Sequence, residues 1–401
     1  MKSRRAGGAP AVSTLALALV TGFGPFGVDA YLPALPAVTR TFGASSSLVQ
    51  LTITVFLVGL AIGQLIAGPV SDAVGRRRLV LAGTVVVALT SALCILAPTI
   101  GSLLVARSVQ GLAAGSGAAI GVAIVSDRFS GAEAAAKFGT LAAIRLIAPV
   151  VAPAIGGLIL VVSDFRGVFA FMAALGVIVL VAALLGVPET LPVERRQPGG
   201  VRNLVARTAD LLRDPAFRAP VIVQCLATAG FFVYIGGSSF VLQQDLGIGE
   251  GLYSVVFATD AAAMVLVTLL FRLLVHRVPT ARLRGVGLLM SSGAAVLLVL
   301  LELLAGGTAP LAPVWVLLGV AVAGNGFCIP ATTVLAQAAG RRSAGTASSL
   351  SGGLSFLVGG LITPLTGLIG VQTVPVMALA MAVLSTAALV VSRVLRTSAA
   401  R

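Results

Sequence analysis

Long apolar blocks, separated by short clusters of polar and charged residues, run along the whole chain. Uncharged stretches such as 79–106 and 167–188 can each cross a bilayer, whose core needs a helix of about 20 apolar residues. The blocks lack the strict alternation of polar and apolar residues that is typical of a transmembrane β-barrel. The pattern therefore predicts an all-α integral membrane protein.

Twelve transmembrane helices account for these blocks once the two longest are divided. The uncharged stretch 303–340 contains a turn near Gly306–Pro310, and 343–392 must turn near Gly370–Thr373. The first span is too long for a cleavable signal peptide and contains Asp29. The predicted spans are 12–33, 47–68, 79–98, 102–126, 138–161, 167–187, 219–242, 252–275, 284–305, 312–334, 345–369 and 373–393.

Composition excludes two other classes of protein. Apolar residues make up 58% of the chain and charged residues 10%, too few charges for a soluble globule or a disordered chain. A net charge of +14 suggests nucleic acid as the partner of a soluble protein, but basic loops also mark the cytoplasmic face of a membrane protein.

Cys94, Cys225 and Cys328 stand singly in apolar stretches, so we expect neither a disulfide framework nor a metal site.

The distribution of basic residues predicts the orientation. Only Arg40 and Arg166 fall on the side opposite the N-terminus, and Arg107 and Arg145 fall within spans; the rest of the 27 Lys and Arg gather on the N-terminal side. Cytoplasmic loops carry the excess of Lys and Arg. Both chain ends are therefore predicted to be cytoplasmic.

The longest polar segment divides the chain into two sets of six spans. We expect an N-terminal bundle at 1–187, a basic cytoplasmic linker at 188–218 and a C-terminal bundle at 219–401. The fifth span of each half is rich in small residues and proline. Such interrupted helices at matching positions are typical of a transporter's moving interface. The hinge candidates are Pro149, Pro153, Gly156, Gly157 and Pro364.

The loop between the second and third spans carries a recognisable motif. It reads GPVSDAVGRRR from Gly68 to Arg78 and resembles the signature loop of the major facilitator superfamily, G-x-x-x-D-R/K-x-G-R-R/K. Ala73 stands where a basic residue is usual. The fourth span contains Arg107-Ser108-Val109-Gln110-Gly111, which resembles the superfamily's embedded R-x-x-Q-G motif of proton-driven members.

The end of the first span narrows the resemblance. Asp29 begins DAYLPALP, which, with Gln64 in GQLIAGP and Pro188-Glu189-Thr190-Leu191, is similar to the bicyclomycin/chloramphenicol-resistance group (Bcr/CflA) of drug:proton antiporters. The resemblance implies a major facilitator fold with one central cavity. It also implies export of small amphipathic drugs in exchange for protons, by a self-sufficient monomer in the plasma membrane.

Four ionisable residues at membrane depth are candidates for proton coupling, because such residues are rare unless functional. Asp29 and Arg107 fall at similar depth, and we expect Asp29 to carry the proton with Arg107 as its neighbour; the alternative is that Asp29 only caps a helix. Arg145 and Asp260 both fall near the midplane of the membrane. We expect them to form an ion pair between the halves or to line the cavity together; the alternative is that each extends to the membrane interface or finds a separate polar partner.

A second charged cluster is expected on the cytoplasmic side. By the family resemblance, Gly68, Asp72, Gly75, Arg76 and Asp127 form a gate that holds the inner end shut when the outer end is open. Asp72 would also lie near the N-terminus of the eleventh span, where the helix dipole favours an anion. The alternative is that the arginines only anchor the topology.

Substrate contacts are predicted from polar and aromatic residues within or at the ends of spans. Asn and Gln in such helices also hydrogen-bond between helices, so packing is the alternative role. The polar candidates are Tyr31, Gln64, Gln224, Tyr234, Asn325 and Gln337, and the aromatic ones are Phe56, Phe231, Phe232 and Phe257.

There are three alternatives to a proton-coupled drug exporter, of which the sequence disfavours two. A metabolite such as a sugar or amino-acid derivative could be the substrate. A membrane enzyme is disfavoured because the sequence has one histidine, no P-loop and no metal-ligand cluster, so no cofactor is expected. With Asp29 and Asp260 embedded and no nucleotide site, we expect an ion gradient as the energy source. The family resemblance implies protons, whereas the residues alone leave sodium open. A channel is disfavoured because a two-half architecture favours alternating access.

Overall fold

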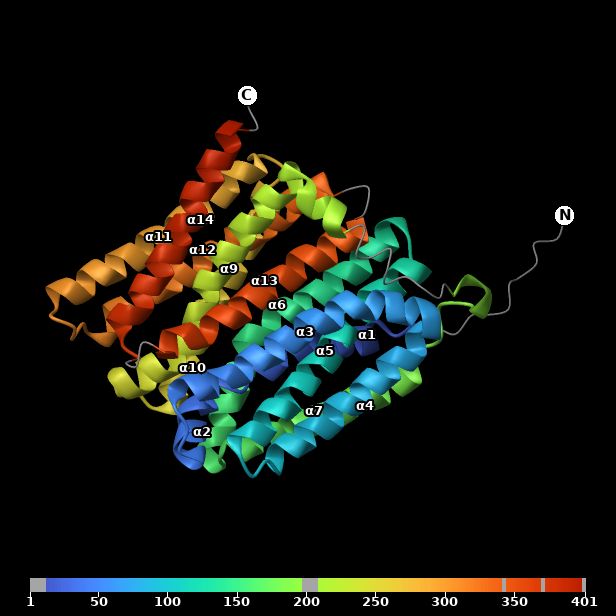
Figure 1. The fold of residues 1–401 in the computed structure, drawn as a ribbon, viewed down its shortest axis with the longest axis horizontal. Coiled ribbons are helices and arrows are strands. Elements are labelled where there is room, and N and C mark those ends of the chain that lie inside the picture. Colours follow the sequence, from blue (N-terminus) through green and yellow to red (C-terminus); the bar gives the residue numbers. More distant parts are fainter. Residues whose placement is uncertain (1–11, 197–207, 341–343, 369–371, 399–401) are drawn as a thin grey trace.

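The computed structural model describes residues 12–196, 208–340, 344–368 and 372–398, and within them it contains helices and no strand (Figure 1). The two chain ends, whose cytoplasmic location was predicted, lie outside these residues, as does 197–207 of the predicted linker. The long helices are α1 (Thr14–Asp29), α3 (Ser46–Val74), α4 (Arg76–Ile95), α5 (Ile100–Arg128), α6 (Gly131–Val162), α7 (Phe165–Gly186), α9 (Pro215–Phe240), α10 (Glu250–Leu274), α11 (Thr280–Leu304), α12 (Leu311–Ala339), α13 (Ala344–Leu368) and α14 (Val374–Ser398).

Shorter elements connect some of these helices. A 3₁₀ turn η1 (Leu32–Ala34) and the helix α2 (Leu35–Phe42) follow α1, a 3₁₀ turn η2 (Val193–Arg195) follows α7, and a π turn η3 (Val241–Asp245) extends α9. Within the described residues, eleven helical segments are long and apolar enough to cross a membrane, and α13 adds the apolar stretch Leu350–Pro364. The predicted all-α membrane architecture is confirmed.

The helices pack as two bundles. In the first, α3 packs on α5, α4 on α5 and α7, and α1 on α5, α6 and α7; in the second, α12 packs on α9, α10 and α11, and α14 on α9 and α11. The bundles meet mainly where α3 packs on α13 and where α6 packs on α10. Figure 1 shows α1–α7 and α9–α14 as neighbouring groups in contact along these helices.

Local sequence signals fix several helix ends. The Ser45 hydroxyl accepts a hydrogen bond from the Leu48 amide at the start of α3, and Thr99 and Ser102 form a capping box at the start of α5. Gly75 separates α3 from α4 with φ at 103°, a backbone conformation that favours glycine. This residue therefore allows the sharp reversal within the signature loop.

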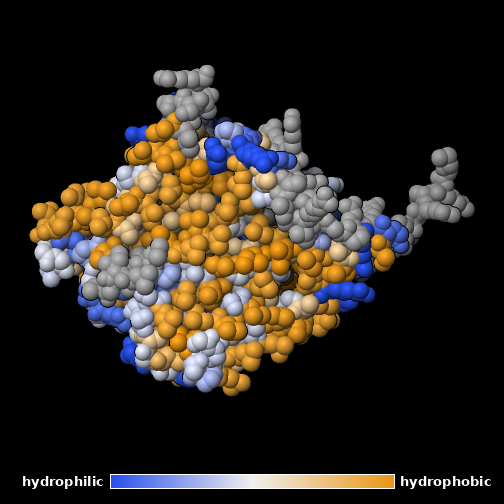
Figure 2. All heavy atoms as spheres, viewed as in Figure 1, coloured by the Kyte–Doolittle hydropathy of each residue, from blue (hydrophilic) through white to orange (hydrophobic). Residues whose placement is uncertain are grey.

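The two ends of the bundle differ in charge. We call the end that carries the α3–α4 turn, with Arg76–Arg78, and the start of α9 the basic end; the opposite end carries α2 and η3. Between them the outer surface is apolar, with exposed side chains such as Leu185 and Leu304. Figure 2 shows apolar residues over most of one face and hydrophilic residues towards its margins. A lipid environment accounts for this surface.

Two expectations about the helices need correction. The first span ends as a helix at Asp29, because the turn η1 with Pro33 follows, and α6 begins at Gly131 rather than 138. Pro149 and Pro153 lie inside an uninterrupted α6, and Pro364 lies inside α13. The predicted helix breaks are absent, since neighbouring helices accommodate the backbone groups that proline leaves unpaired.

Candidate functional site

A central cavity of about 400 Å³ lies between the two bundles. Its wall comes from α1, α3, α5 and α6 on one side and from α9, α10, α12 and α13 on the other. The lining is mainly apolar, and its charged members are Asp29 and Arg145. A pocket of this size and polarity is suited to a drug-sized amphipathic molecule.

Asp29 occupies the last position of α1 on the cavity wall. Its side chain is buried, with the residue 5% exposed, and it has no ion-pair or hydrogen-bond partner among the described residues. An ionised carboxylate in apolar surroundings is costly unless a proton or a cation compensates it. Asp29 is therefore placed to take up a proton or a cationic group from the cavity.

Arg145 also lines the cavity but does not pair with Asp260. Its guanidinium donates a hydrogen bond of 3.4 Å to the Ala118 carbonyl of α5. Asp260 instead accepts a 2.8 Å hydrogen bond from the Tyr234 hydroxyl, and no ion pair between Arg145 and Asp260 exists in the described structure. The predicted inter-bundle ion pair is absent, because Asp260 lies behind Tyr234 rather than across from Arg145.

Arg107 lies inside the first bundle and not on the cavity wall. It is fully buried and donates a 2.7 Å hydrogen bond to Gln110, which in turn donates to Ser91. The guanidinium carbon lies 4.3 Å from the centre of the Phe56 ring and 5.1 Å from that of Tyr31. Arg107 is thus held by cation–π contacts and one amide, and within the described residues no carboxylate contacts it.

Aromatic side chains form much of the cavity wall contributed by the second bundle. Phe231 and Tyr234 stack with ring centres 6.5 Å apart, and Tyr234 stacks on Phe257 at 5.4 Å. Phe232 packs edge-on against Phe356, a cavity residue that was not predicted from the sequence. We call Phe231, Tyr234 and Phe257 the aromatic column.

Hydrogen bonds between the bundles close the cavity towards the end opposite the basic end. Gln50 of α3 donates to the Gly236 carbonyl at 2.9 Å, and Thr54 donates to the Gly360 carbonyl at 2.7 Å. Gln243 donates to the Pro33 carbonyl at 3.1 Å. Such a hydrogen bond depends on how the two bundles are placed against each other. The sequence of a single helix does not contain this information, so Gln50 was not predicted.

Glycines of α6 allow close packing both inside the first bundle and against the second bundle. An added Cβ at Gly156 of α6 would overlap the backbone of Ala30, and one at Gly157 would overlap the side chain of Ser254 on α10. Near the basic end, by contrast, Gly68 has no neighbour that such a Cβ would meet within 4 Å. The hinge candidates of α6 are therefore points of close packing.

The charged cluster at the basic end is assembled around Arg76. The Arg76 guanidinium pairs with Asp72 at 2.7 Å and with Asp127 at 3.0 Å. The backbone N–H of Arg76 donates a hydrogen bond to the Glu189 carboxylate at 3.0 Å. Thr190 donates to Asp127 at 3.3 Å. The expected gating residues thus lie together, and the segment after α7 completes the cluster.

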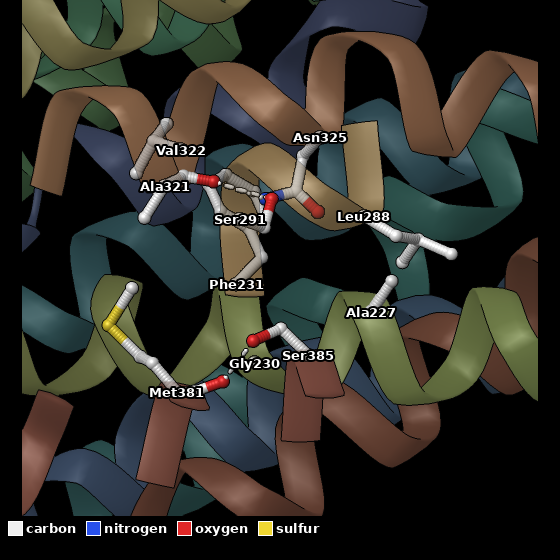
Figure 3. A pocket seen from close by; sticks show the side chains of 10 residues that line it. All are labelled: Ala227, Gly230, Phe231, Leu288, Ser291, Ala321, Val322, Asn325, Met381 and Ser385. Atoms are coloured by element: carbon white, nitrogen blue, oxygen red, sulfur yellow. Dashed lines mark hydrogen bonds between the residues drawn. The ribbon is translucent and has the colours of Figure 1, made fainter. Parts of the chain in front are cut away.

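Of the predicted substrate-contact residues, some line the cavity and others lie elsewhere. Those on the cavity wall are Gln64, Gln224, Phe231, Phe232, Tyr234 and Phe257. Tyr31 and Phe56 surround Arg107 instead, and Gln337 is exposed on α12. Asn325 borders a separate pocket of about 10 Å³ and donates to the Ala321 carbonyl (Figure 3). This space holds at most a water molecule, so Asn325 serves packing.

Comparison with known proteins places these features in a family. The sequence model of the Major Facilitator Superfamily matches residues 17–364. The chain is 33% identical to the uncharacterized MFS-type transporter YdgK of Bacillus subtilis (strain 168), covering 90% of each chain. It is 28% identical to a bicyclomycin resistance protein homolog of Haemophilus influenzae, covering 90% of this chain and 89% of the relative.

Solved structures show the same fold at low sequence identity. The human organic anion transporter MFSD10 (TETRAN) superposes with a TM-score of 0.72 at 17% identity, covering 95% of this chain and 98% of that one. A POT family transporter in complex with 5-aminolevulinic acid gives a TM-score of 0.74 at 15% identity, covering 96% of this chain and 95% of that one.

Proposed function

Because this chain belongs to the Major Facilitator Superfamily, we propose that it exports small amphipathic drugs across the plasma membrane in exchange for protons. Membership makes it a multi-pass membrane transporter, and relatives named for bicyclomycin resistance and multidrug resistance support drug efflux as the general activity. Proton coupling and the substrate are the further parts of the proposal.

The observation that carries the proposal is the carboxylate of Asp29, which no described residue pairs with, in an apolar, drug-sized cavity. A protonated Asp29 is stable in this cavity when no cation is present, and a substrate that draws near can displace the proton. The Tyr234 hydroxyl donates a hydrogen bond to Asp260, so a charge change at Asp260 reaches the aromatic column. Asp260 is the second candidate carrier.

We assign the basic end to the cytoplasm, following the positive-inside rule. The hydrogen bonds of Gln50, Thr54 and Gln243 then close the outer end, and the structure corresponds to a transporter that faces inwards. In the opposite state, the Asp72–Arg76–Asp127 cluster would keep the first bundle's inner end rigid while the bundles close there.

A proton gradient supplies enough free energy for this exchange. One elementary charge crossing 100 mV releases about 2.3 kcal/mol. Since about 1.4 kcal/mol corresponds to one decade of concentration, one proton could concentrate a neutral drug roughly tens-fold.

The test is drug-driven proton movement in proteoliposomes that contain the purified protein and a pH-sensitive dye. We expect chloramphenicol to drive proton flux with the wild type, and Asp29→Asn to lower that flux at least about tenfold, because an amide cannot release a proton. Asp210→Asn, which changes an exposed carboxylate near the basic end, serves as the matched control and should leave the flux unchanged.

Two results would contradict the proposal. If the wild type moves neither chloramphenicol nor other amphipathic drugs against a proton gradient, efflux is wrong and a metabolite screen follows. If Asp29→Asn still exchanges drug for protons at the wild-type rate, the carrier is another residue, and Asp260→Asn is the next variant.

A further inference from the structure

Among the residues that the structure describes, Arg145 on the cavity wall is a cation without a counter-ion. Its only hydrogen bond to a described residue is the 3.4 Å contact with the Ala118 carbonyl, and no carboxylate of the described structure lies within ion-pair distance. A guanidinium in apolar surroundings at membrane depth costs several kcal/mol unless an anion or a dipole compensates it. The geometry therefore leaves a place for an anionic group beside Arg145.

Asp29 cannot be that group, because it lies too far along the cavity. Gly22 of α1 packs against Ile144, the residue before Arg145, which places Arg145 beside this part of α1. Asp29 follows Gly22 by two helical turns, or about 10 Å along the axis. The cavity thus presents a cation and an anion at separate positions on the wall of the first bundle.

The aromatic column lines the opposite wall of the same cavity. The planes of Phe231 and Tyr234 are inclined by 15° and those of Tyr234 and Phe257 by 18°, so the rings are nearly parallel. Flat aromatic molecules gain packing and quadrupole interactions against such rings. Asp29, Arg145 and the aromatic column all line this one cavity, so a single bound molecule can contact all three.

We propose that Arg145 binds an anionic group of the substrate and that the preferred substrate is a flat aromatic zwitterion. Its carboxylate pairs with Arg145, its rings pack on the aromatic column, and its protonated amine contacts Asp29 once that carboxylate has released its proton. This inference rests on the proposed function and names its substrate class. The amine and the proton compete for Asp29, which couples binding to proton release.

The experiment measures the binding of two fluorescent probes to the purified protein in detergent. Norfloxacin carries a carboxylate and an amine on a flat aromatic body, and its ethyl ester keeps the body and the amine but lacks the carboxylate. We expect the wild type to bind norfloxacin at least about tenfold more tightly than the ester, as for a charge-assisted hydrogen bond.

Arg145→Gln should remove this preference and leave the affinity for the ester unchanged. Arg145→Lys should keep part of it, because the charge remains and the bidentate geometry is lost. Arg272→Gln, at an exposed arginine of α10, is the matched control and should keep the wild-type preference. Chloramphenicol-driven proton flux is measured on the same preparations.

The inference is overturned if Arg145→Gln keeps the preference for norfloxacin, or if the wild type binds both probes equally or neither. In those cases an intact, Asp29-dependent chloramphenicol flux would leave the proposed function standing. Loss of that flux in the wild type would refute the proposed function itself.

Discussion

At the scale of single residues, the buried charges differ in how their surroundings compensate them. Arg107 has three aromatic rings and Gln110 around it, whereas Asp29 faces the cavity with no partner among the described residues. A charge enclosed by protein side chains has little access to protons or ions, while a charge that faces a cavity without a partner favours exchange of a proton or an ion. The residues that change state in transport are therefore expected on the cavity wall.

Gln110→Leu is predicted to destabilise the protein, because it removes the 2.7 Å acceptor of the buried Arg107 guanidinium. The cost should be about 2 kcal/mol, that of leaving a buried charged donor unpaired. The thermal unfolding midpoint in detergent, followed by circular dichroism, should fall by several degrees.

The double variant Arg107→Met/Gln110→Leu provides the control for this prediction. It removes donor and acceptor together and should recover most of the lost stability. A double variant that is no more stable than Gln110→Leu would show that the loss comes from packing rather than from the unpaired guanidinium.

At the scale of helices, glycines allow the close approach of α3 and α5 inside the first bundle. An added Cβ at Gly111 of α5 would overlap the backbone of Phe56, and one at Gly115 would overlap that of Leu60. Membrane helices associate through such close packing, since lipid tails remove the hydrophobic driving force. The position of Arg107, one turn before Gly111, depends on this contact.

Gly111→Ala is predicted to reduce the amount of folded protein severely, because its methyl group meets main chain that cannot move aside. Gly139→Ala on α6 is the matched control, because a Cβ there meets nothing within 4 Å. Size-exclusion profiles of fluorescent fusions would measure both. Equal yields of the two variants would contradict the argument.

At the scale of the whole molecule, the two bundles are joined at one end by hydrogen bonds that involve backbone carbonyls. Gln50 and Gln243 each reach across the interface with a single amide donor. Each such bond contributes only about 1 kcal/mol net. Rocking of one bundle against the other is therefore possible without breaking either bundle's interior.

Gln50→Leu is predicted to shift the population towards a state in which this end is open. Spin labels are placed at the exposed positions 41 and 252, in a background without Cys94, Cys225 and Cys328. The distance between the two labels, measured by double electron–electron resonance, should increase. Thr52→Val on the same helix removes only bonds within the first bundle and is the control. Identical distance distributions in all three proteins would refute the role of Gln50.

Signals local to the chain were enough to predict the fold. Apolar blocks of bilayer length, basic loops and the signature loop from Gly68 to Arg78 were sufficient, because lipid permits few ways to satisfy a buried backbone. The same loop predicted that Asp72 and Arg76 lie together, because they are neighbours along the chain. Asp127 joins them because it lies at the end of α5, beside the loop.

Packing between distant helices determines which buried residues face the cavity and which partners they have. Depth in the membrane placed Asp29 level with Arg107 and Arg145 level with Asp260, but depth carries no information on the direction in which a helix face points. The rotation of each helix about its axis decides this direction. Arg107 faces a cluster of aromatic rings and Asp260 faces Tyr234, whereas Asp29 and Arg145 lie on the cavity wall. That rotation is set by contacts such as those of α6 on α10, which no single span encodes.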